Sequence, residues 1–234
     1  MNEVDSMEKE QLLNQAALLE REPVETILRW AVDTFGDEMV LACSCGPEDL
    51  VILDQLTRIT SRPKVFFLDT DKHFEETYAT KEKLEQKYDF TFIVVKAELT
   101  LAEQAATYGA NLWEHNPNLC CQLRKVNPLK QILNKYRAWI TGIRREQSPT
   151  RANAKVVEWD HLFSLMKVNP LVGWTKEDVW TYIRAHDLPY NPLHDQHYPS
   201  IGCSVCTKPV KLGEDERAGR WSGHEKTECG LHKG

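Results

Sequence analysis

Two pairs of cysteines carry the strongest chemical signal in this sequence. Cys120 and Cys121 are adjacent, and Cys203 and Cys206 form a Cys-x-x-Cys pair much further along the chain. Four thiolates gathered in this way are typical of a metal or iron-sulfur site. A zinc knuckle or a redox pair would also use a Cys-x-x-Cys pair, and a doublet can be two unrelated core thiols. Because zinc sites usually use two spaced pairs, the doublet favours iron-sulfur and leaves zinc open.

A fifth cysteine, Cys229, follows in a region of different composition. Residues 189–234 are rich in Pro, Gly, His and charged residues and poor in aliphatic ones. This composition predicts a metal-pinned loop followed by a mobile segment. Lys226 and His232 are the nearby cations that could lower the pKa of the Cys229 thiol. By itself, Cys229 would more simply be an incidental thiol.

Composition limits the classes of protein to consider. The chain has 234 residues, 41% of them hydrophobic, which suits one domain or one domain with a small appendage. No stretch approaches the roughly 20 apolar residues of a membrane span. A net charge of −6 argues against general nucleic-acid binding. The acidic first residues do not resemble a secretory signal, so we expect a cytoplasmic protein, in which seven cysteines favour metal or redox roles over disulfides.

Buried strands are expected to alternate with helices along most of the chain. Such alternation predicts βαβ units, and hence an α/β fold with a mostly parallel sheet flanked by helices. Ligands of such sheets bind beyond the carboxyl ends of the strands. The expected strands are 39–43, 64–68, 90–95, 139–141 and 163–168.

Three of these strands end in residues suited to binding a nucleotide. The first runs into Ser44-Cys45-Gly46-Pro47 and then a helix, a geometry that points backbone N–H groups at a phosphate. The lysine of a Walker A motif is missing, and an ordinary strand–helix turn stays open. The second strand ends at Asp69, which could bind ribose or cap a helix. The fourth leaves at Gly142 into an arginine-rich loop that reaches Arg151.

The cysteine doublet is expected to lie at the start of a helix. Asn118 is a suitable N-cap, and Pro128 predicts a break before a second helix that ends near Tyr136. Lys125 then lies one turn beyond Cys121 on the same face. A solvated lysine is the plainer alternative.

Seven motifs are distinctive in combination. They are Cys120-Cys121 followed by Arg124-Lys125, Cys203-Ser204-Val205-Cys206, Glu216-Arg217-Ala218-Gly219-Arg220-Trp221, Glu228-Cys229-Gly230-Leu231-His232, the turn 44–49, Leu68-Asp69-Thr70 and the loop 141–151. Together they resemble one family, the assimilatory adenylylsulfate reductases, which are grouped with the 3′-phosphoadenylylsulfate reductases. The resemblance covers residues 25–232.

The resemblance implies an adenine-nucleotide alpha-hydrolase-like (PP-loop-like) fold and a [4Fe–4S] cluster. We expect one nucleotide-binding domain, 1–207, and a mobile segment, 208–234, in which Cys229 is the nucleophile. Asp71 departs from the family, since many relatives have glycine there, and Cys43 and Cys45 are extra thiols. The implied cluster ligands are Cys120, Cys121, Cys203 and Cys206. The implied substrate-binding residues are Ser44, Asp69, Thr70, Lys125, Arg144, Arg145, Arg217, Arg220 and His232, with the rest of the loop 142–151 around the nucleotide.

The implied reaction belongs to sulfate assimilation and cysteine biosynthesis. Adenylylsulfate, or its 3′-phosphorylated form, is reduced to sulfite and AMP, or adenosine 3′,5′-bisphosphate. Thiolate attack on sulfur leaves a Cys229 S-sulfonate, while Arg217 and Arg220 neutralise the anion, from one helical face if their stretch is helical. No resolving cysteine lies beside Cys229, so an external dithiol donor, thioredoxin or a glutaredoxin-like protein, is expected. Substrate preference and a homo-oligomer stay open.

Two other classes of function stay open. An ATP-dependent adenylating or thiolating enzyme with the same nucleotide fold would release pyrophosphate, and it would leave Cys229 without a purpose. An iron-sulfur or zinc-binding regulator would need a basic surface for DNA, which the net charge of −6 disfavours.

Overall fold

The computed structural model describes residues 3–221, 223, 226 and 230. The chain divides into two compact units, each assembled from separate stretches of sequence. The predicted boundary after residue 207 concerns the mobility of the last segment and stays a prediction. Unit 1 consists of Met1–Cys43, Pro47–Val65 and Leu133–Leu188, and unit 2 of Ser44–Gly46, Phe66–Ile132 and Pro189–Gly234.

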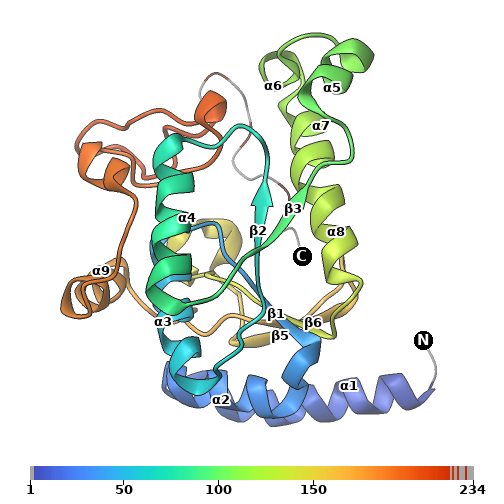
Figure 1. Cartoon of the computed structure of the whole chain (residues 1–234). Coiled ribbons are helices and arrows are strands. Elements are labelled where there is room, and N and C mark those ends of the chain that lie inside the picture. Colours follow the sequence, from blue (N-terminus) through green and yellow to red (C-terminus); the bar gives the residue numbers. More distant parts are fainter. Residues whose placement is uncertain (1–2, 222, 224–225, 227–229, 231–234) are drawn as a thin grey trace. The chain divides into compact units, whose positions relative to one another are not determined.

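Unit 1 contains a sheet in which most neighbouring strands are parallel (Figure 1). β1 (Met39–Ala42) pairs with β4 (Ala138–Ile140), and β4 pairs with β6 (Leu165–Val168), both in parallel register. β5 (Val157–Asp160) pairs antiparallel with β6. All three residues of β4 are buried, as in a parallel sheet covered on both faces.

The helices of unit 1 form because their apolar residues recur at helical spacing. In α2 (Val24–Phe35) the buried residues include Ile27, Leu28 and Ala31. α2 packs against α3 (Pro47–Ile59), and α3 packs against α9 (Lys176–Ala185), which begins with a capping box. α1 (Glu3–Ala16) contacts β5.

Unit 2 is built on the parallel pair β2 (Val65–Asp69) and β3 (Ile93–Lys96). α4 (Glu75–Tyr88) connects these strands. A chain of helices follows β3 and ends in one continuous rod, formed by α7, a π-helical segment and α8 (Figure 1). These helices are α5 (Leu101–Tyr108), α6 (Leu112–His115), α7 (Pro117–Cys121), the π-helix Gln122–Val126 and α8 (Asn127–Leu133).

Short 3-10 segments complete the two units. They lie mostly in the connections and in the part of the chain that follows α9. They are Ala17–Arg21, Gly36–Glu38, Arg145–Gln147, Pro149–Arg151, Pro192–Gln196 and Ser204–Cys206.

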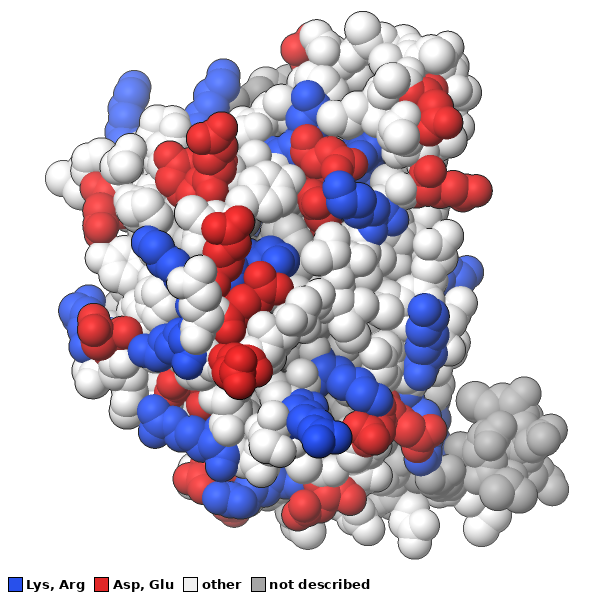
Figure 2. Space-filling view, viewed as in Figure 1, with Lys and Arg blue, Asp and Glu red and all other residues white. Residues whose placement is uncertain are grey.

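The predicted fold class is confirmed, since strands alternate with helices and pair mostly in parallel. β5 was not predicted, because Val-Glu-Trp-Asp is too short for its alternation to stand out. Residues 113–117 read as a loop in the sequence, but α6 and the start of α7 occupy them. No helix of the described residues is long and apolar enough to cross a bilayer. On the face drawn in Figure 2, acidic and basic side chains are interspersed.

Candidate active site

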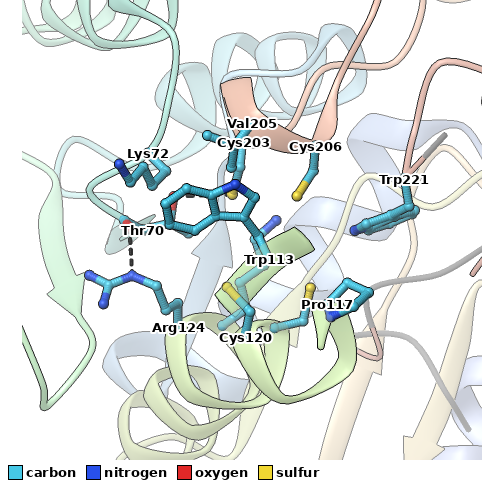
Figure 3. A pocket seen from close by; sticks show the side chains of 12 residues that line it. Thr70, Lys72, Trp113, Pro117, Cys120, Arg124, Cys203, Val205, Cys206 and Trp221 are labelled. Atoms are coloured by element: carbon cyan, nitrogen blue, oxygen red, sulfur yellow. Dashed lines mark hydrogen bonds between the residues drawn. The ribbon is translucent and has the colours of Figure 1, made fainter. Parts of the chain in front are cut away.

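The four predicted cluster cysteines line one pocket of unit 2. Cys120 and Cys121 reach it from the helical rod, and Cys203 and Cys206 from the loop around the 3-10 segment Ser204–Cys206. Figure 3 shows Cys203 and Cys206 opposite Cys120, with the sulfur atoms turned toward the shared space. The other lining residues are Thr70, Lys72, Trp113, Pro117, Arg124, Lys125, Val205 and Trp221.

The N-cap of the helix that carries the doublet lies two residues before the predicted one. Asn116, not Asn118, is the cap, and its Oδ1 accepts a hydrogen bond from the Leu119 amide at 3.0 Å. The prediction for Asn118 is therefore wrong. Pro117 explains the shift, because its fixed φ and missing N–H suit the first helical position.

The expected break at Pro128 is also wrong, because the rod continues through it. Just before Pro128 the helix widens to a π-helix, in which the Asn127 amide donates to the Gln122 carbonyl oxygen. Since proline cannot donate to the carbonyl four residues earlier, a wider turn accommodates it without ending the helix. Lys125 and Cys121 line the same pocket, as their spacing predicted.

Arg124 is a structural residue in this arrangement. Its side chain is buried, and its Nε donates to the Thr70 carbonyl oxygen at 2.7 Å (Figure 3). Its terminal nitrogens donate to the Leu99 carbonyl and to Gln104 Oε1, each at 3.2 Å, and to the Asp71 carboxylate. Arg124 thus ties the rod to the end of β2.

Thr70 and Lys72 hold the Cys203 loop against the end of β2. The Ser204 amide donates to the Lys72 carbonyl oxygen at 2.7 Å, and the Thr70 hydroxyl lies 3.3 Å from Cys203 Sγ. Burial raises the pKa of the Cys203 thiol, but the Lys125 charge, the Thr70 hydroxyl and the Arg220 charge outweigh it, so the net pKa is lowered. The site therefore favours a thiolate at Cys203.

Cys120 and Cys206 differ from Cys203, because their pKa values are raised. Their ionised forms would need a bound metal to compensate the negative charge. Burial, and then repulsion by Cys121 and Cys203, raises the pKa of Cys120 to about 11. Burial and then Cys203 raise that of Cys206 to about 12. Metal binding displaces such protons, which couples ligation to pH. A pure sulfur donor set suits iron-sulfur or zinc.

Among the described residues, no three His, Cys, Asp or Glu side chains form a group that could hold a metal ion. A [4Fe–4S] cluster does not need such a group, since each of four cysteines ligates a different iron. The four-thiol pocket and this finding therefore do not conflict.

Arg220 lies beside the cysteine loop. Its Nη1 donates to Ser200 Oγ at 3.0 Å, and its guanidinium carbon lies 4.6 Å from the centre of the Trp221 ring. That of Arg217 lies 5.9 Å from the same ring. Their stretch is a turn and not a helix, so the condition for a shared helical face is not met, although both cations approach one indole.

The chain around Arg220 is pinned to the cysteine loop. Thr207 and Arg220 form an antiparallel bridge, and the Trp221 amide donates to the Cys206 carbonyl oxygen at 3.0 Å. A Cβ added to Gly219 would lie 2.1 Å from the Lys208 carbonyl oxygen, so only glycine allows this approach. Trp221 is buried and lines the thiol pocket.

Asp69 and Ser44, predicted nucleotide ligands, both belong to unit 2. Asp69 is buried, accepts hydrogen bonds from the Tyr78 hydroxyl and the Asp71 amide, and pairs with Lys96 at 3.2 Å. Burial raises its pKa, but these partners outweigh the effect and lower it overall, so the carboxylate is ionised. Ser44 is exposed, in the turn before α3.

Arg144 and Arg145, also predicted substrate residues, belong to unit 1. Arg144 is buried and pairs with Glu48 at 2.8 Å, and Arg145 pairs with Glu20. Gly142, where this loop begins, packs so close to α3 that an added Cβ would lie 2.7 Å from Asp49 Oδ1. Both arginines therefore have carboxylate partners, and their contact with a substrate stays a prediction.

Cys229 and His232 lie outside the described residues. Within unit 2, the structure gathers the four predicted cluster cysteines, Thr70 and Lys125 at one pocket, and Arg217 and Arg220 lie near the Trp221 ring that lines it. Trp221 was not predicted to line the pocket, although its motif was part of the resemblance. Its position directly after Arg220 in that motif could have indicated it.

The fold and the thiol pocket define an α/β protein with a mostly parallel sheet and a four-cysteine pocket. The model of the phosphoadenosine phosphosulfate reductase domain matches residues 38–209. The chain belongs to this family, as its motifs indicated.

Two curated relatives are similar over most of their length. The chain is 54% identical over 208 residues to adenosine 5′-phosphosulfate reductase 2 of Bacillus subtilis, which covers 88% of each chain. It is 52% identical over 222 residues to adenosine 5′-phosphosulfate reductase of Halalkalibacterium halodurans, covering 94% of this chain and 95% of the relative.

Solved structures agree with the fold. Phosphoadenylyl-sulfate reductase from Candida auris, in a phosphate complex, matches with a TM-score of 0.73 and 31% identity, over 86% of this chain and 95% of that one. FMN adenylyltransferase of Candida glabrata matches with a TM-score of 0.57 and 17% identity, over 88% of this chain and 72% of that one, so the likeness shows the fold alone.

Proposed function

We propose that this protein reduces adenylylsulfate to sulfite and AMP, with a [4Fe–4S] cluster in the thiol pocket and a dithiol protein as electron donor. The observation that carries the proposal is the convergence of four cysteines with Thr70 and Lys125 at the end of β2. Relatives that share about half of its residues carry the name of this activity. 3′-Phosphoadenylylsulfate is the alternative substrate, since the family model and one solved relative carry its name.

The pocket residues bind and orient in this proposal. Cys120, Cys121, Cys203 and Cys206 would hold the cluster, which would organise the site and polarise it together with Lys125. Lys125, Arg217 and Arg220 neutralise the phosphosulfate, because a thiolate and an anionic substrate repel each other otherwise. Arginine is suited to bidentate contact with oxyanions. Ser44, Asp69, Thr70, Arg144 and Arg145 are proposed around the nucleotide, and His232 beside the phosphosulfate.

Cys229 performs the group transfer. Its thiolate attacks the sulfur of adenylylsulfate, an S–S bond forms, the bond from sulfur to the phosphate oxygen breaks, and AMP leaves. A thiolate of thioredoxin, or of a glutaredoxin-like donor, then attacks Cys229 Sγ and releases sulfite. The second donor thiol resolves the mixed disulfide and frees Cys229, so two electrons pass from the dithiol to sulfur.

Chemistry of this kind needs a compartment in which thiols stay reduced. The cytoplasm is such a compartment, and we place the reaction there. The expected context is assimilation of sulfate toward cysteine, for which sulfite is the intermediate that must be reduced further.

An anaerobic sulfite assay tests the proposal. The reconstituted protein is incubated with thioredoxin and either adenylylsulfate or its 3′-phosphate, and wild type is compared with Cys229→Ser. We expect sulfite from the wild type and none from the variant. The ratio of the two substrates' rates gives the preference.

A second arm omits the donor. Wild type incubated with adenylylsulfate alone should gain roughly 80 Da on the peptide that contains Cys229, as expected for a sulfonated thiol. AMP release without this mass would contradict the covalent step. Pyrophosphate release from ATP would instead support an adenylating enzyme of the same fold.

A further inference from the structure

Trp113 lines the four-cysteine pocket and also reaches the surface of unit 2. It belongs to α6, the short helix before the helical rod, and its side chain is half-buried. In Figure 3 the indole lies between the loop of Cys203 and Cys206 and the helix that carries Cys120. A side chain that faces a pocket on one side and solvent on the other is part of the wall between them.

A lysine holds the Trp113 ring in this position. The Lys72 ammonium lies 4.7 Å from the centre of the ring, which is the range of a cation–π contact. The Lys72 carbonyl oxygen accepts hydrogen bonds from the Ser204 amide at 2.7 Å and from the Ser204 hydroxyl at 3.1 Å. Lys72 therefore ties both the Trp113 ring and the loop that follows Cys203 to the end of β2.

The four thiols differ in how well the pocket covers them. Cys121 and Cys203 are buried, whereas Cys120 and Cys206 are only half-buried. Val205, which also lines the pocket, is 40% exposed. A small molecule from solvent would therefore reach the site first at Cys120 and Cys206, and the cover on that side decides how fast it arrives.

We infer that Trp113, held by Lys72, restricts the access of small molecules to these thiols and to the group that they bind. The inference rests on the proposed function, because it concerns the cluster proposed for this pocket. An indole suits the task, since it covers a large area with few rotatable bonds. The apolar shell around a metal site controls the access of solvent to it.

A wall residue and a general packing residue predict different behaviour of the cysteines. If Trp113 is a wall of the pocket, its loss exposes the pocket while other buried thiols keep their protection. If it only packs the unit together, its loss loosens the unit and exposes every buried thiol alike. Cys45 separates the two cases, because it is 2% exposed, belongs to unit 2 and is not among the residues that line the pocket.

The experiment compares four variants of the full-length protein. Trp113→Ala removes the ring, and Trp113→Phe is the conservative variant. Lys72→Gln removes the charge over the ring and keeps the backbone carbonyl that holds Ser204. Trp159→Ala is the matched control, since this ring is also half-buried and has a lysine ammonium 4.2 Å from its centre, but lies in β5 of unit 1. Melting temperatures verify that each variant is folded.

The first measurement uses the cluster-containing protein without oxygen. Loss of visible absorbance reports the release of iron to the chelator EDTA, and peptide mass reports the alkylation of Cys45 by iodoacetamide. We expect Trp113→Ala to release iron about tenfold faster, with the Cys45 rate within about twofold of wild type. Lys72→Gln should release iron about threefold faster, as for loss of one cation–π contact. Trp113→Phe should restore most of the protection, and Trp159→Ala should change neither rate.

The second measurement uses the metal-free protein, in which iodoacetamide can reach the pocket cysteines themselves. Trp113→Ala should speed the alkylation of Cys120 and Cys206 relative to that of Cys45. Unchanged rates in Trp113→Ala, or an equal acceleration at Cys45, would overturn the inference. A wild type that binds no iron would instead sink the cluster of the proposed function, and the alkylation rates would still decide the role of Trp113.

Discussion

The guanidinium of Arg220 occupies the space that a side chain on Gly202 would fill. An added Cβ on Gly202 would lie 2.2 Å from Arg220 Nη2 and 2.6 Å from its guanidinium carbon. Gly202 directly precedes Cys203, whose thiol the Arg220 charge helps to keep at a lowered pKa. Because Gly202 has no side chain, the Arg220 guanidinium can lie against the loop that carries Cys203.

We expect Gly202→Ala to impair the enzyme through Arg220. The alanine should displace the flexible arginine rather than the backbone, so stability should change by less than about 1 kcal/mol. The KM for adenylylsulfate should rise about tenfold or more, as for loss of one charge-assisted contact. In an Arg220→Ala background, Gly202→Ala should have no further effect on KM. Gly173→Ala is the control, because nothing lies within 4 Å of a Cβ added there. If the effects of Gly202→Ala and Arg220→Ala on KM were additive, the mechanism would be refuted.

Lys125→Ala should depress turnover far more than stability. Lys125 is buried at the pocket and lowers the pKa of both Cys203 and His73 by its charge. Removing a cation that faces a developing anionic transition state typically costs about 2–3 kcal/mol, or roughly a hundredfold in kcat. Iron content and visible absorbance establish that the cluster is retained. An unchanged kcat with an intact cluster would exclude a role of Lys125 in stabilising the transition state.

Asp71→Gly should destabilise the protein although the backbone favours glycine there. Asp71 has φ +55°, which costs a non-glycine residue about 1 kcal/mol. Its carboxylate, however, pairs with buried Arg124 and with Lys96 at 2.7 Å. Breaking a buried pair costs about 3–5 kcal/mol, and partial exposure of Asp71 reduces this. We expect a net loss of about 1–3 kcal/mol in urea unfolding, and a smaller one for Asp71→Asn; a gain for Asp71→Gly would show that strain dominates.

Acid should destabilise the fold through His73. Burial is the main cause that lowers its pKa from 6.5 to about 4, although the Leu68 carbonyl, 2.9 Å from Nε2, opposes it. A carbonyl only accepts, so the neutral ring carries its proton on Nε2. Between pH 6.5 and 4 the unfolded chain binds a proton that the folded chain excludes. The contribution of neutral His73 to the free energy of unfolding is therefore complete above pH 6.5, and it is lost as the pH falls from 6.5 to 4.

The size of this effect is up to about 3 kcal/mol. Urea unfolding at several pH values, for wild type and for His73→Gln, measures it. Glutamine can still donate to the Leu68 carbonyl but does not titrate, so its stability should fall less steeply below pH 6.5. Parallel curves for the two proteins would contradict this assignment.

Local pattern was enough to predict the α/β class, most strands and the alternation of strands with helices. Met39–Ala42 and Val65–Asp69 are short apolar runs bounded by polar turns, and α9 begins at the capping box of Thr175. Such signals depend on a residue and its near neighbours. β5 and the π-helix before Pro128 were missed, because pairing at a sheet edge and the path of a helix around a proline depend on distant contacts.

The sequence by itself determined the chemistry that is available: four thiols in two pairs, a fifth near the end, and cations beside them. Only the tertiary structure decided which of these groups meet. Arg124 and Lys125 are adjacent, yet Arg124 is tied to the end of β2 while Lys125 faces the thiols. Neighbours on a helix point in different directions, and the partners that each direction reaches come from remote parts of the chain.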